Sequence, residues 1–481
     1  MLFNSLDFAV FLPTVFLLYW FVLGKNLKVQ NALIVVASYV FYGWWDWRFL
    51  SLIFFSTLVD FTIGRRLQST AAPRARKHLL WASIAVNLGF LGVFKYYNFF
   101  LDNFVEAFSF FGGHLQARTL NIVLPVGISF YTFQTLSYTI DVYRKKLEPA
   151  KDLVAFMAFV SFFPQLVAGP IERATHLLPQ FYKRRAFDER WAVDGLRQIV
   201  WGLFKKMVIA DNAAQIANEL FNHSGDYAGA TLALGALFFT FQIYGDFSGY
   251  SDIAIGTARL FGFDLMQNFR FPYFSRDIAE FWRRWHISLS TWFRDYLYIP
   301  LGGSRGGTWH KVRNTFIIFL VSGFWHGANW TFIVWGALNA LYFLPLLLAN
   351  KNRTHLGDVA QGRALPTLRE LFSMLLTFGL TVLAWVFFRA DSVGHAWSYL
   401  TGMAQQPQTY FSGDTYSPYW RELTMIAVFI VIEWWGRGGK YALESLGTSW
   451  PRPLRWSFYY AVCIAVFYFG GNEQEFIYFQ F

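Results

Sequence analysis

Long runs of apolar residues without a charged side chain recur along the chain and limit it to a membrane fold. These charge-free runs cover 8–24, 29–45, 79–94, 120–140, 153–171, 227–245, 314–350, 371–388 and 456–472. Weaker apolar segments, which include charged residues, cover 49–63, 198–216 and 422–432. A helix needs about 20 such residues to cross the hydrocarbon core of a bilayer. Because several runs are shorter, some segments should tilt or insert only partly. The pattern predicts an all-α polytopic membrane protein with about 11 transmembrane helices plus re-entrant and interfacial helices.

Composition agrees with a membrane protein. Hydrophobic residues make up 55% of the 481 positions and charged residues only 15%, whereas soluble proteins carry about 25% charged residues. The single cysteine, Cys463, excludes an intramolecular disulfide and a thiolate metal cluster. Neither an internal repeat nor a polar segment long enough for a soluble domain is visible. Residues 1–481 are therefore expected to form a single membrane domain.

The net charge of +11 lies mainly in short loops between the apolar runs. Membrane topology and contact with anionic lipid explain such loops better than nucleic acid binding does. The positive-inside rule places them in the cytoplasm. The expected partner of this charge is thus the lipid bilayer, and no nucleic acid partner is expected. The basic loops are 64–78, 144–151, 183–206, 276–313, 351–369 and 437–455.

The stretch "FFPQLVAGPIER" at 162–173 interrupts an apolar run with two prolines and a glycine. Both of its flanks are basic, which favours a segment that enters the membrane and returns on the same side. Re-entrant backbone is tolerated where protein or a water-filled cavity satisfies it. The alternative is a kinked transmembrane helix.

His326 and Tyr342 are the only ionisable side chains between 314 and 350. As one helix this run would extend about 55 Å, too long for a single span and too short for two full spans with a loop. A bent hairpin that turns near 326–329 would place His326 deep in the protein. Gly323 and Gly327 would let backbone or substrate approach closely. Ionisable residues inside membranes are functional candidates, although a hydrogen-bonded structural role is the alternative.

The second notable histidine, His286, lies in a stretch that is expected to be an amphipathic helix in the membrane interface. A basic and polar face holds Arg283, Ser290 and Arg294. Glu280 can pair with Arg284 one turn away. His286 borders the apolar stripe, so it either faces the active centre or is a plain interfacial residue. The apolar stripe consists of Phe281, Trp285, Leu289, Trp292 and Tyr296.

Motifs of competing chemistries are missing from the sequence. It contains no G-x-S-x-G elbow, no Walker A lysine and no H-E-x-x-H. Its nine histidines do not have metal-ligand spacing, so no metal is expected. What remains is general base catalysis, because a histidine near its ordinary pKa can take a proton from a hydroxyl. That hydroxyl can attack an acyl thioester, and apolar walls would keep water away from the thioester.

Five stretches together make the chain similar to a known family. They are "GFWHGANW" at 323–330, "FWRRWHISLSTWFRDYLYIPLGG" at 281–303, "LPVGISFYTFQTLSYTIDVYR" at 124–144, "FPQLVAGPIER" at 163–173 and "YGDFSGYSDIAIG" at 244–256. The sequence resembles the membrane-bound O-acyltransferase (MBOAT) family, and within it the bacterial alginate O-acetyltransferase branch. The likeness runs from "MLFNSLDF" at the start to "FIYFQF" at 476–481.

The resemblance implies a ring of helices around a thin centre, with a funnel from each side. His326 matches the buried catalytic histidine of the family, and His286 matches the second active-site histidine of this branch. The implied activity moves an acetyl group across the bacterial inner membrane for O-acetylation of an exported polysaccharide. A periplasmic partner of the SGNH-hydrolase-like class would complete the transfer, so the polysaccharide is an indirect partner.

The residues add expectations about binding. No cofactor is expected to be resident, and acetyl-CoA is the expected donor substrate. Since this donor is large and anionic, its entrance should be basic, and the candidates are Arg283, Arg284, Arg294 and Arg305. The residues expected to shape the cavity are Trp325, Asn329, Asp246 and Asp252. The two aspartates could instead be buried caps of helix ends.

Two rival interpretations remain at this point. The chain could be a proton-coupled transporter or flippase in which His326 relays protons, but such proteins usually pair carboxylates with bases inside the membrane. Only Asp60, Asp246 and Asp252 are candidates for such carboxylates. Alternatively, the same chemistry could serve cellulose, peptidoglycan or another polymer, because no residue pattern identifies the sugar.

Overall fold

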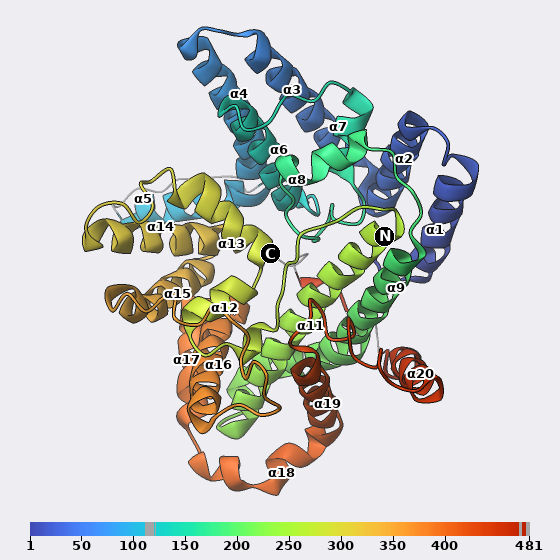
Figure 1. The fold of residues 1–481 in the computed structure, drawn as a ribbon. Helices are drawn as coiled ribbons and strands as arrows, with labels where there is room; N and C mark the ends of the chain where they lie inside the picture. The colour runs from blue at the N-terminus through green and yellow to red at the C-terminus, as the bar shows by residue number, and fades with distance from the viewer. Residues whose placement is uncertain (111–119, 121, 471–473, 478–481) are drawn as a thin grey trace. The chain divides into compact units, whose positions relative to one another are not determined.

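The computed structural model describes residues 1–110, 120, 122–470 and 474–477. Every regular element within these ranges is a helix, which confirms the all-α prediction (Figure 1). The chain forms two compact units. The first comprises Met1–Val193 with Thr257–Met266, and the second comprises Asp194–Gly256 with Gln267–Phe481.

The first unit is built around α6, against which α3 and α4 both pack. Ser5 begins the unit's first helix by accepting a hydrogen bond from the backbone N–H of Phe8. Its helices are α1 (Leu6–Leu17), α2 (Leu27–Asp46), α3 (Leu50–Ser69), α4 (Pro73–Leu91), α5 (Tyr97–Phe110), α6 (Ile128–Tyr143), α7 (Leu153–Ser161) and α8 (Ala174–Leu177).

Asp60 lies at the centre of the first unit and is fully buried. The amide of Asn87 donates to one carboxylate oxygen at 2.8 Å, and the hydroxyl of Thr139 donates to the other at 3.0 Å. Ser83 donates a further hydrogen bond. Neutral donors from α4 and α6 thus hold this carboxylate, as buried charged groups require.

The proline-rich stretch 162–173 leaves the helix instead of continuing it. α7 has only nine residues, about 14 Å of helix, and from Phe162 the backbone is irregular and buried. The alternative of one kinked helix therefore does not fit. Entry into and return from a bilayer stays a prediction.

The second unit contains the long helix α11 and a series of helical hairpins. Two short π-helical segments, Phe204–Ala210 and Arg294–Tyr298, interrupt its helices. α9 (Glu189–Leu203) and α11 (Ala230–Leu260) belong mainly to this unit. The remaining helices are α10 (Asp211–Asn222), α12 (Ile278–Arg284), α13 (Ile287–Phe293), α14 (Thr308–His326), α15 (Trp330–Leu348), α16 (Leu368–Arg389), α17 (Val393–Ala404), α18 (Gly413–Tyr416), α19 (Trp420–Gly436) and α20 (Arg452–Phe469).

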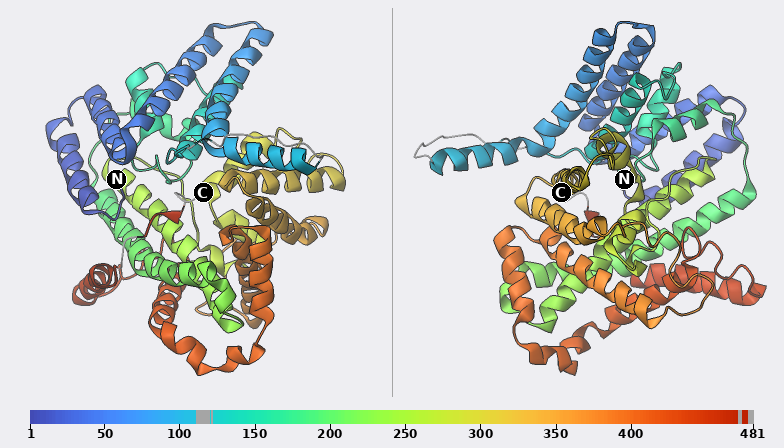
Figure 2. Two further views of the ribbon diagram at one scale, coloured as in Figure 1. Left: turned by 180° about the vertical axis from the view of Figure 1, so that it is seen from behind. Right: turned by 60° about the vertical axis from the view of Figure 1, so that its left-hand side comes forward.

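Five helical stretches in the described residues are long and apolar enough to cross a membrane. The protein is therefore a multi-pass membrane protein, while the count of about 11 spans stays a prediction. Figure 2 shows the same helices from two further directions. The five stretches are Leu27–Ser69, Pro73–Phe110, Ala230–Leu260, Trp330–Leu348 and Leu368–Arg389, and the apolar helix Leu6–Val22 is shorter.

Candidate active site

His326 is the last residue of α14, where the chain turns sharply into α15. The turn occupies 327–329, and the side chain of Asn329 caps α15 by accepting from the N–H of Thr331. His326 is only 6% exposed. The hairpin predicted near 326–329 is confirmed. Its first arm begins at Thr308, before the apolar run, so each arm has 19 residues and can be a full-length helix.

Two glycines allow the arms of this hairpin to touch. A methyl group added at Gly323 would collide with the carbonyl oxygen of Phe332, and one added at Gly336 would collide with that of Phe319. Backbone therefore packs directly on backbone, as small residues permit between membrane helices. This packing fixes the position of His326 at the end of the hairpin.

His286 lies between α12 and α13, not within a continuous helix. Its φ of 44° is in the left-handed region, which is strained for a residue with a Cβ and is found mainly at functional sites. The prediction of one amphipathic helix here is wrong. The predicted apolar stripe is nevertheless largely buried, including Phe281, Trp285 and Leu289.

Asn268, which the sequence analysis did not single out, explains the break. Its carbonyl oxygen accepts from the N–H of Ile287 at 2.8 Å. Its side-chain oxygen lies 2.9 Å from Nδ1 of His286 and 2.9 Å from Oγ of Ser288. These tertiary bonds replace the local bonds of a helix. No local pattern around Asn268 signals them, because they join positions that are distant in sequence.

Burial lowers the pKa of His286 well below its usual value, and nearby His326 lowers it further. A second positive charge beside the first is unfavourable. The pKa shift of His286 therefore favours its neutral form. A buried, neutral imidazole can act as a proton acceptor.

Aromatic rings surround both histidines. The ring of Phe247 lies edge-on to His286 with centroids 4.6 Å apart. Trp335 and Phe388 each lie 5.3 Å from the ring of His326. Trp385 stacks on Trp335 at 5.6 Å and extends this wall. Both imidazoles therefore have apolar neighbours, while the exclusion of water from a reaction at this site stays a prediction.

Asp246 and Asp252 lie inside α11 and do not cap its ends, so that alternative is wrong. Asp246 pairs with Lys206 at 2.9 Å, and Asp252 pairs with Lys205 at 2.6 Å. Both lysines come from the π-helical segment and are buried. The sequence predicts a basic cytoplasmic loop at 183–206 that includes both lysines, whereas they lie in a helical segment. The attraction between each aspartate and its lysine offsets the free-energy cost of removing both charges from water.

The other two residues expected to shape a cavity have different surroundings. Asn329 is fixed at both ends of its amide, since Nδ2 also donates to the carbonyl oxygen of Asp391 at 2.9 Å. Trp325 is half-buried. Asn329 therefore ties the turn after His326 to the segment that follows α16.

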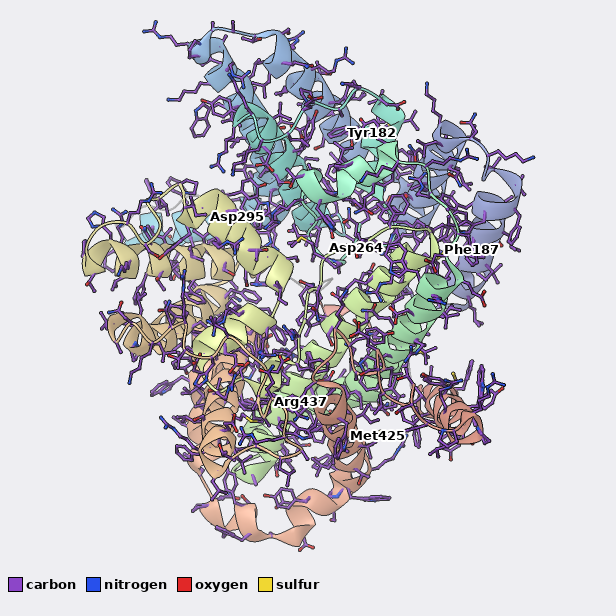
Figure 3. All side chains as sticks on the ribbon, viewed as in Figure 1. Tyr182, Phe187, Asp264, Asp295, Met425 and Arg437 are labelled. Atoms are coloured by element: carbon purple, nitrogen blue, oxygen red, sulfur yellow. The ribbon has the colours of Figure 1, made fainter. Side chains whose placement is uncertain are left out.

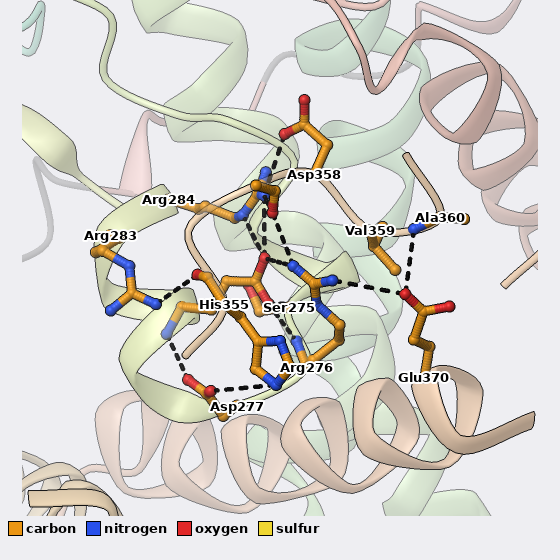
Figure 4. A network of polar contacts seen from close by, with 12 residues as sticks. Ser275, Arg276, Asp277, Arg283, Arg284, His355, Asp358, Val359, Ala360 and Glu370 are labelled. Carbon is orange, nitrogen blue, oxygen red and sulfur yellow. Dashed lines mark hydrogen bonds and ion pairs between the residues drawn. The ribbon is translucent and has the colours of Figure 1, made fainter. Parts of the chain in front are cut away.

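Arg283 and Arg284 belong to a polar network that holds a loop (Figure 4). Arg283 donates to the carbonyl oxygens of Asn352 and His355 at 2.7 and 2.8 Å. Arg284 pairs with buried Glu280 at 3.0 Å, as predicted, and with Asp358 at 3.2 Å. These contacts give both arginines a structural role in this state.

Arg294 lines a pocket, while its predicted role in donor binding stays a prediction. It lines a pocket of about 510 Å³ together with Lys311 and Arg353. Its neighbour Asp295, labelled in Figure 3, pairs with it at 2.8 Å. Arg305 is exposed on the loop before α14. The apolar part of the pocket is formed by Ile318, Phe319, Phe343 and Leu347.

Aromatic contacts connect this pocket with His326. Phe319 contacts Trp282 at 5.3 Å between centroids, and Trp282 contacts Trp335 at 5.6 Å. Trp335 in turn contacts His326. No group of three or more metal-ligating side chains occurs within the described residues.

The chain thus combines membrane helices, two buried histidines against aromatic rings and a separate pocket with basic side chains, which agrees with a membrane acyltransferase. Residues 150–387 match the model of the membrane-bound O-acyltransferase family. The chain is 43% identical over 398 residues to the probable alginate O-acetylase AlgI of Pseudomonas aeruginosa, covering 82% of this chain and 74% of that protein. The protein belongs to the membrane-bound O-acyltransferase family and is an acyltransferase.

Two further relatives have other named activities. The peptidoglycan O-acetyltransferase of Helicobacter pylori is 36% identical over 433 residues, which cover 84% of this chain and 80% of that protein. The teichoic acid D-alanyltransferase of Bacillus subtilis is 29% identical over 241 residues, which cover 46% of this chain and 58% of that protein. The relatives thus share acyl transfer, while their named polymers differ.

Proposed function

We propose that the protein takes an acetyl group from acetyl-CoA in the cytoplasm and passes it across the bacterial inner membrane. The acetyl group is destined for hydroxyls of an exported, alginate-like polysaccharide. The single observation that carries this proposal is the pair of buried histidines, His286 and His326, each of which lies against aromatic rings. A pair of imidazoles suits proton transfer at neutral pH.

In the proposed reaction His326 takes the proton of an acceptor hydroxyl. The hydroxyl oxygen forms a bond to the thioester carbonyl carbon, the carbon–sulfur bond breaks, and the proton goes to the departing sulfur. The products are an acetyl ester and free CoA thiol, so atoms and charges balance. No resident cofactor or metal takes part.

The pocket beside Arg294 is the proposed donor entrance. CoA carries several phosphate charges, which Arg294, Lys311 and Arg353 would attract. The apolar floor suits the uncharged arm that ends in the thioester. The aromatic contacts from Phe319 to His326 mark the proposed direction of that arm.

The arrangement of the transmembrane helices is also part of the proposal. We infer a ring of about 11 spans around a thin centre, with one funnel from each side. The segment 391–420 has no lysine or arginine, which favours the periplasmic side. It contains only short helices, among them α17 and α18, which are too small to hold a polysaccharide in attack geometry. A periplasmic partner of the SGNH-hydrolase-like class would therefore receive the acetyl group and modify the polymer.

Peptidoglycan, cellulose or another polymer is the second candidate for the acceptor, and the Helicobacter pylori relative favours peptidoglycan among these. A transporter is less favoured. Lysines neutralise Asp246 and Asp252, and neutral donors hold Asp60. Because other side chains hold all three carboxylates, none of them is arranged to carry protons through the membrane.

Reconstitution in liposomes tests the proposal. Radiolabelled acetyl-CoA is enclosed, and alginate with or without the periplasmic partner is added outside. We expect label on the polymer only with the partner present and with His326 intact. Transfer to the polymer without a second protein would contradict the proposed division of labour. Absence of any acetyl transfer, with or without the partner, would contradict the function itself.

A further inference from the structure

Asn268 is fully buried in the segment between α11 and α12 and contacts both sides of the His286 break. Besides the two contacts already described, its Oδ1 accepts from the backbone N–H of Ser288 at 3.4 Å. Its Nδ2 donates to Oγ of Ser251 on α11 at 2.9 Å. One amide therefore joins α11, His286 and the start of α13.

These contacts determine the orientation of the Asn268 amide, that is, the positions of its oxygen and its nitrogen. A backbone N–H can only donate, so the amide atom that faces the N–H of Ser288 is the oxygen. The same oxygen faces Nδ1 of His286, so Nδ1 carries the hydrogen. In a neutral imidazole the other nitrogen, Nε2, then holds the lone pair.

We propose that Asn268 is a positioning residue for acyl transfer, which holds His286 as the Nδ1–H tautomer and makes Nε2 its proton-accepting atom. This inference rests on the proposed function. In that reaction one proton moves from a hydroxyl to a sulfur, and a second imidazole beside His326 can share this proton only through a nitrogen that keeps its lone pair. Asn268 ensures that this nitrogen is Nε2.

The strained backbone supports the same conclusion. Left-handed φ at a residue with a Cβ persists where surrounding contacts impose it. The N–H of Ile287 binds the carbonyl oxygen of Asn268, and the N–H of Arg270 binds the carbonyl oxygen of Arg284 at 2.9 Å. These two bonds bracket His286 from either side. The ring is thus oriented by its backbone as well as by the amide.

Other titratable groups near His286 also influence the pH dependence of kcat and have to be considered when that dependence is measured. His326 on α14 acts directly on the pKa of His286. On α11, Tyr244 donates to buried Glu433 at 2.8 Å, and Tyr250 is a further buried titratable group. Charged groups on these elements form ion pairs. These pairs are Asp246 with Lys206, Asp252 with Lys205, Arg270 and Arg284 with Asp358, Arg284 with Glu280, and Arg294 with Asp295.

Asn268→Asp is the sharpest test, because it keeps the shape and places a carboxylate against Nδ1. A nearby opposite charge favours the imidazolium and raises the pKa of His286 by about one unit or more. We expect the acidic limb of the kcat–pH profile to move to higher pH by about that amount. Asn222→Asp adds the same charge at an exposed position and should leave the profile unchanged.

Asn268→Ala removes the acceptor and should lower kcat at least about tenfold with little change in KM for the donor. Nitrogen-15 NMR of histidine-labelled protein gives a readout without turnover, with the His286 signal identified by its loss in His286→Ala. We expect an Nδ1–H signal in the native protein that Asn268→Ala converts to a mixture of tautomers. A native acidic limb in Asn268→Asp together with an unchanged tautomer in Asn268→Ala would overturn the inference. Absence of acetyl transfer by the native protein would instead refute the proposed function.

Discussion

The imidazole of His326 lies edge-on to the indole of Trp335, with ring centroids 5.3 Å apart and planes at 87°. Trp335 comes from the second arm of the hairpin whose first arm ends at His326. The aromatic wall of the site is therefore built by the same turn that delivers the histidine. Disturbing the hairpin should affect both at once.

Replacing His326 with alanine should abolish acyl transfer while the protein stays folded. A positioned acid or base contributes about 10²-fold or more to the rate. Acetyl transfer and thermal unfolding are measured on the purified variant. His223→Ala is the matched control, since His223 is exposed and pairs with Glu219 at the surface. Near-native turnover in His326→Ala would show that His326 is not the base.

Replacing Gly323 with alanine should lower both stability and activity. The added methyl group collides with the carbonyl oxygen of Phe332 and must push α14 away from α15. Gly379→Ala is the control, because a methyl group there meets no atom within 4 Å. That change should stabilise α16 by about 0.5–1 kcal/mol. Equal melting temperatures for the two variants would argue against the close contact of the hairpin arms.

Reversing the charge of Arg294 or Lys311 should raise KM for acetyl-CoA more than it lowers kcat. Both side chains line the pocket, and attraction between exposed charges is screened beyond about 8 Å at physiological ionic strength. The effect should therefore diminish in high salt. Arg452→Glu, at an exposed site in α20, is the control and should leave KM unchanged. A native KM in a pocket variant would show that the donor does not bind in this pocket.

Glu280→Gln should lower the free energy of unfolding of the second unit. It should have no specific effect on donor binding. Glu280 is fully buried and pairs with Arg276 at 2.9 Å and with Arg284 at 3.0 Å. Removing one partner of a buried pair costs about 3 kcal/mol or more. Chemical denaturation measures the loss, with exposed Glu148→Gln as the control. A native denaturation curve would mean that the network contributes little.

The stability of the first unit should fall at alkaline pH through His176. Asp264 and buried Glu172 raise the pKa of His176 to about 10. A raised histidine pKa adds stability that is complete below about 6.5, the unfolded value, declines above it, and is lost above the folded value. Melting temperatures between pH 6 and pH 10.5 should therefore decline more steeply in the native protein than in His176→Asn. Parallel curves would show that the ionisation of His176 does not contribute to the pH dependence of stability.

The sequence predicted the features that local pattern determines. The apolar runs indicated a helical membrane protein, and the length of the run 314–350 indicated the hairpin with its turn near His326. The apolar stripe from Phe281 to Trp292 could be identified from the sequence, although its setting in one interfacial helix was wrong. The pairing of Glu280 with Arg284 followed from helical spacing alone.

Features set by distant contacts could not be predicted in the same way. The bonds from Asn268 break the expected helix at His286, although local propensity favours a helix there. Arg283 and Arg284 bind the loop from Asn352 to Asp358, which positive charge alone does not indicate. Asp246 and Lys206 are far apart in sequence and pair only after α11 has packed.

The aromatic wall also has a consequence for biosynthesis. Phe388, which contacts the ring of His326 at 5.3 Å, lies at the end of α16. The ribosome makes the α14–α15 hairpin well before this residue, so His326 enters the membrane without its full enclosure. Contacts between distant positions form late in folding. A nascent chain that stops short of α16 would therefore lack the side of this aromatic wall that Trp385 and Phe388 build beside Trp335 and His326.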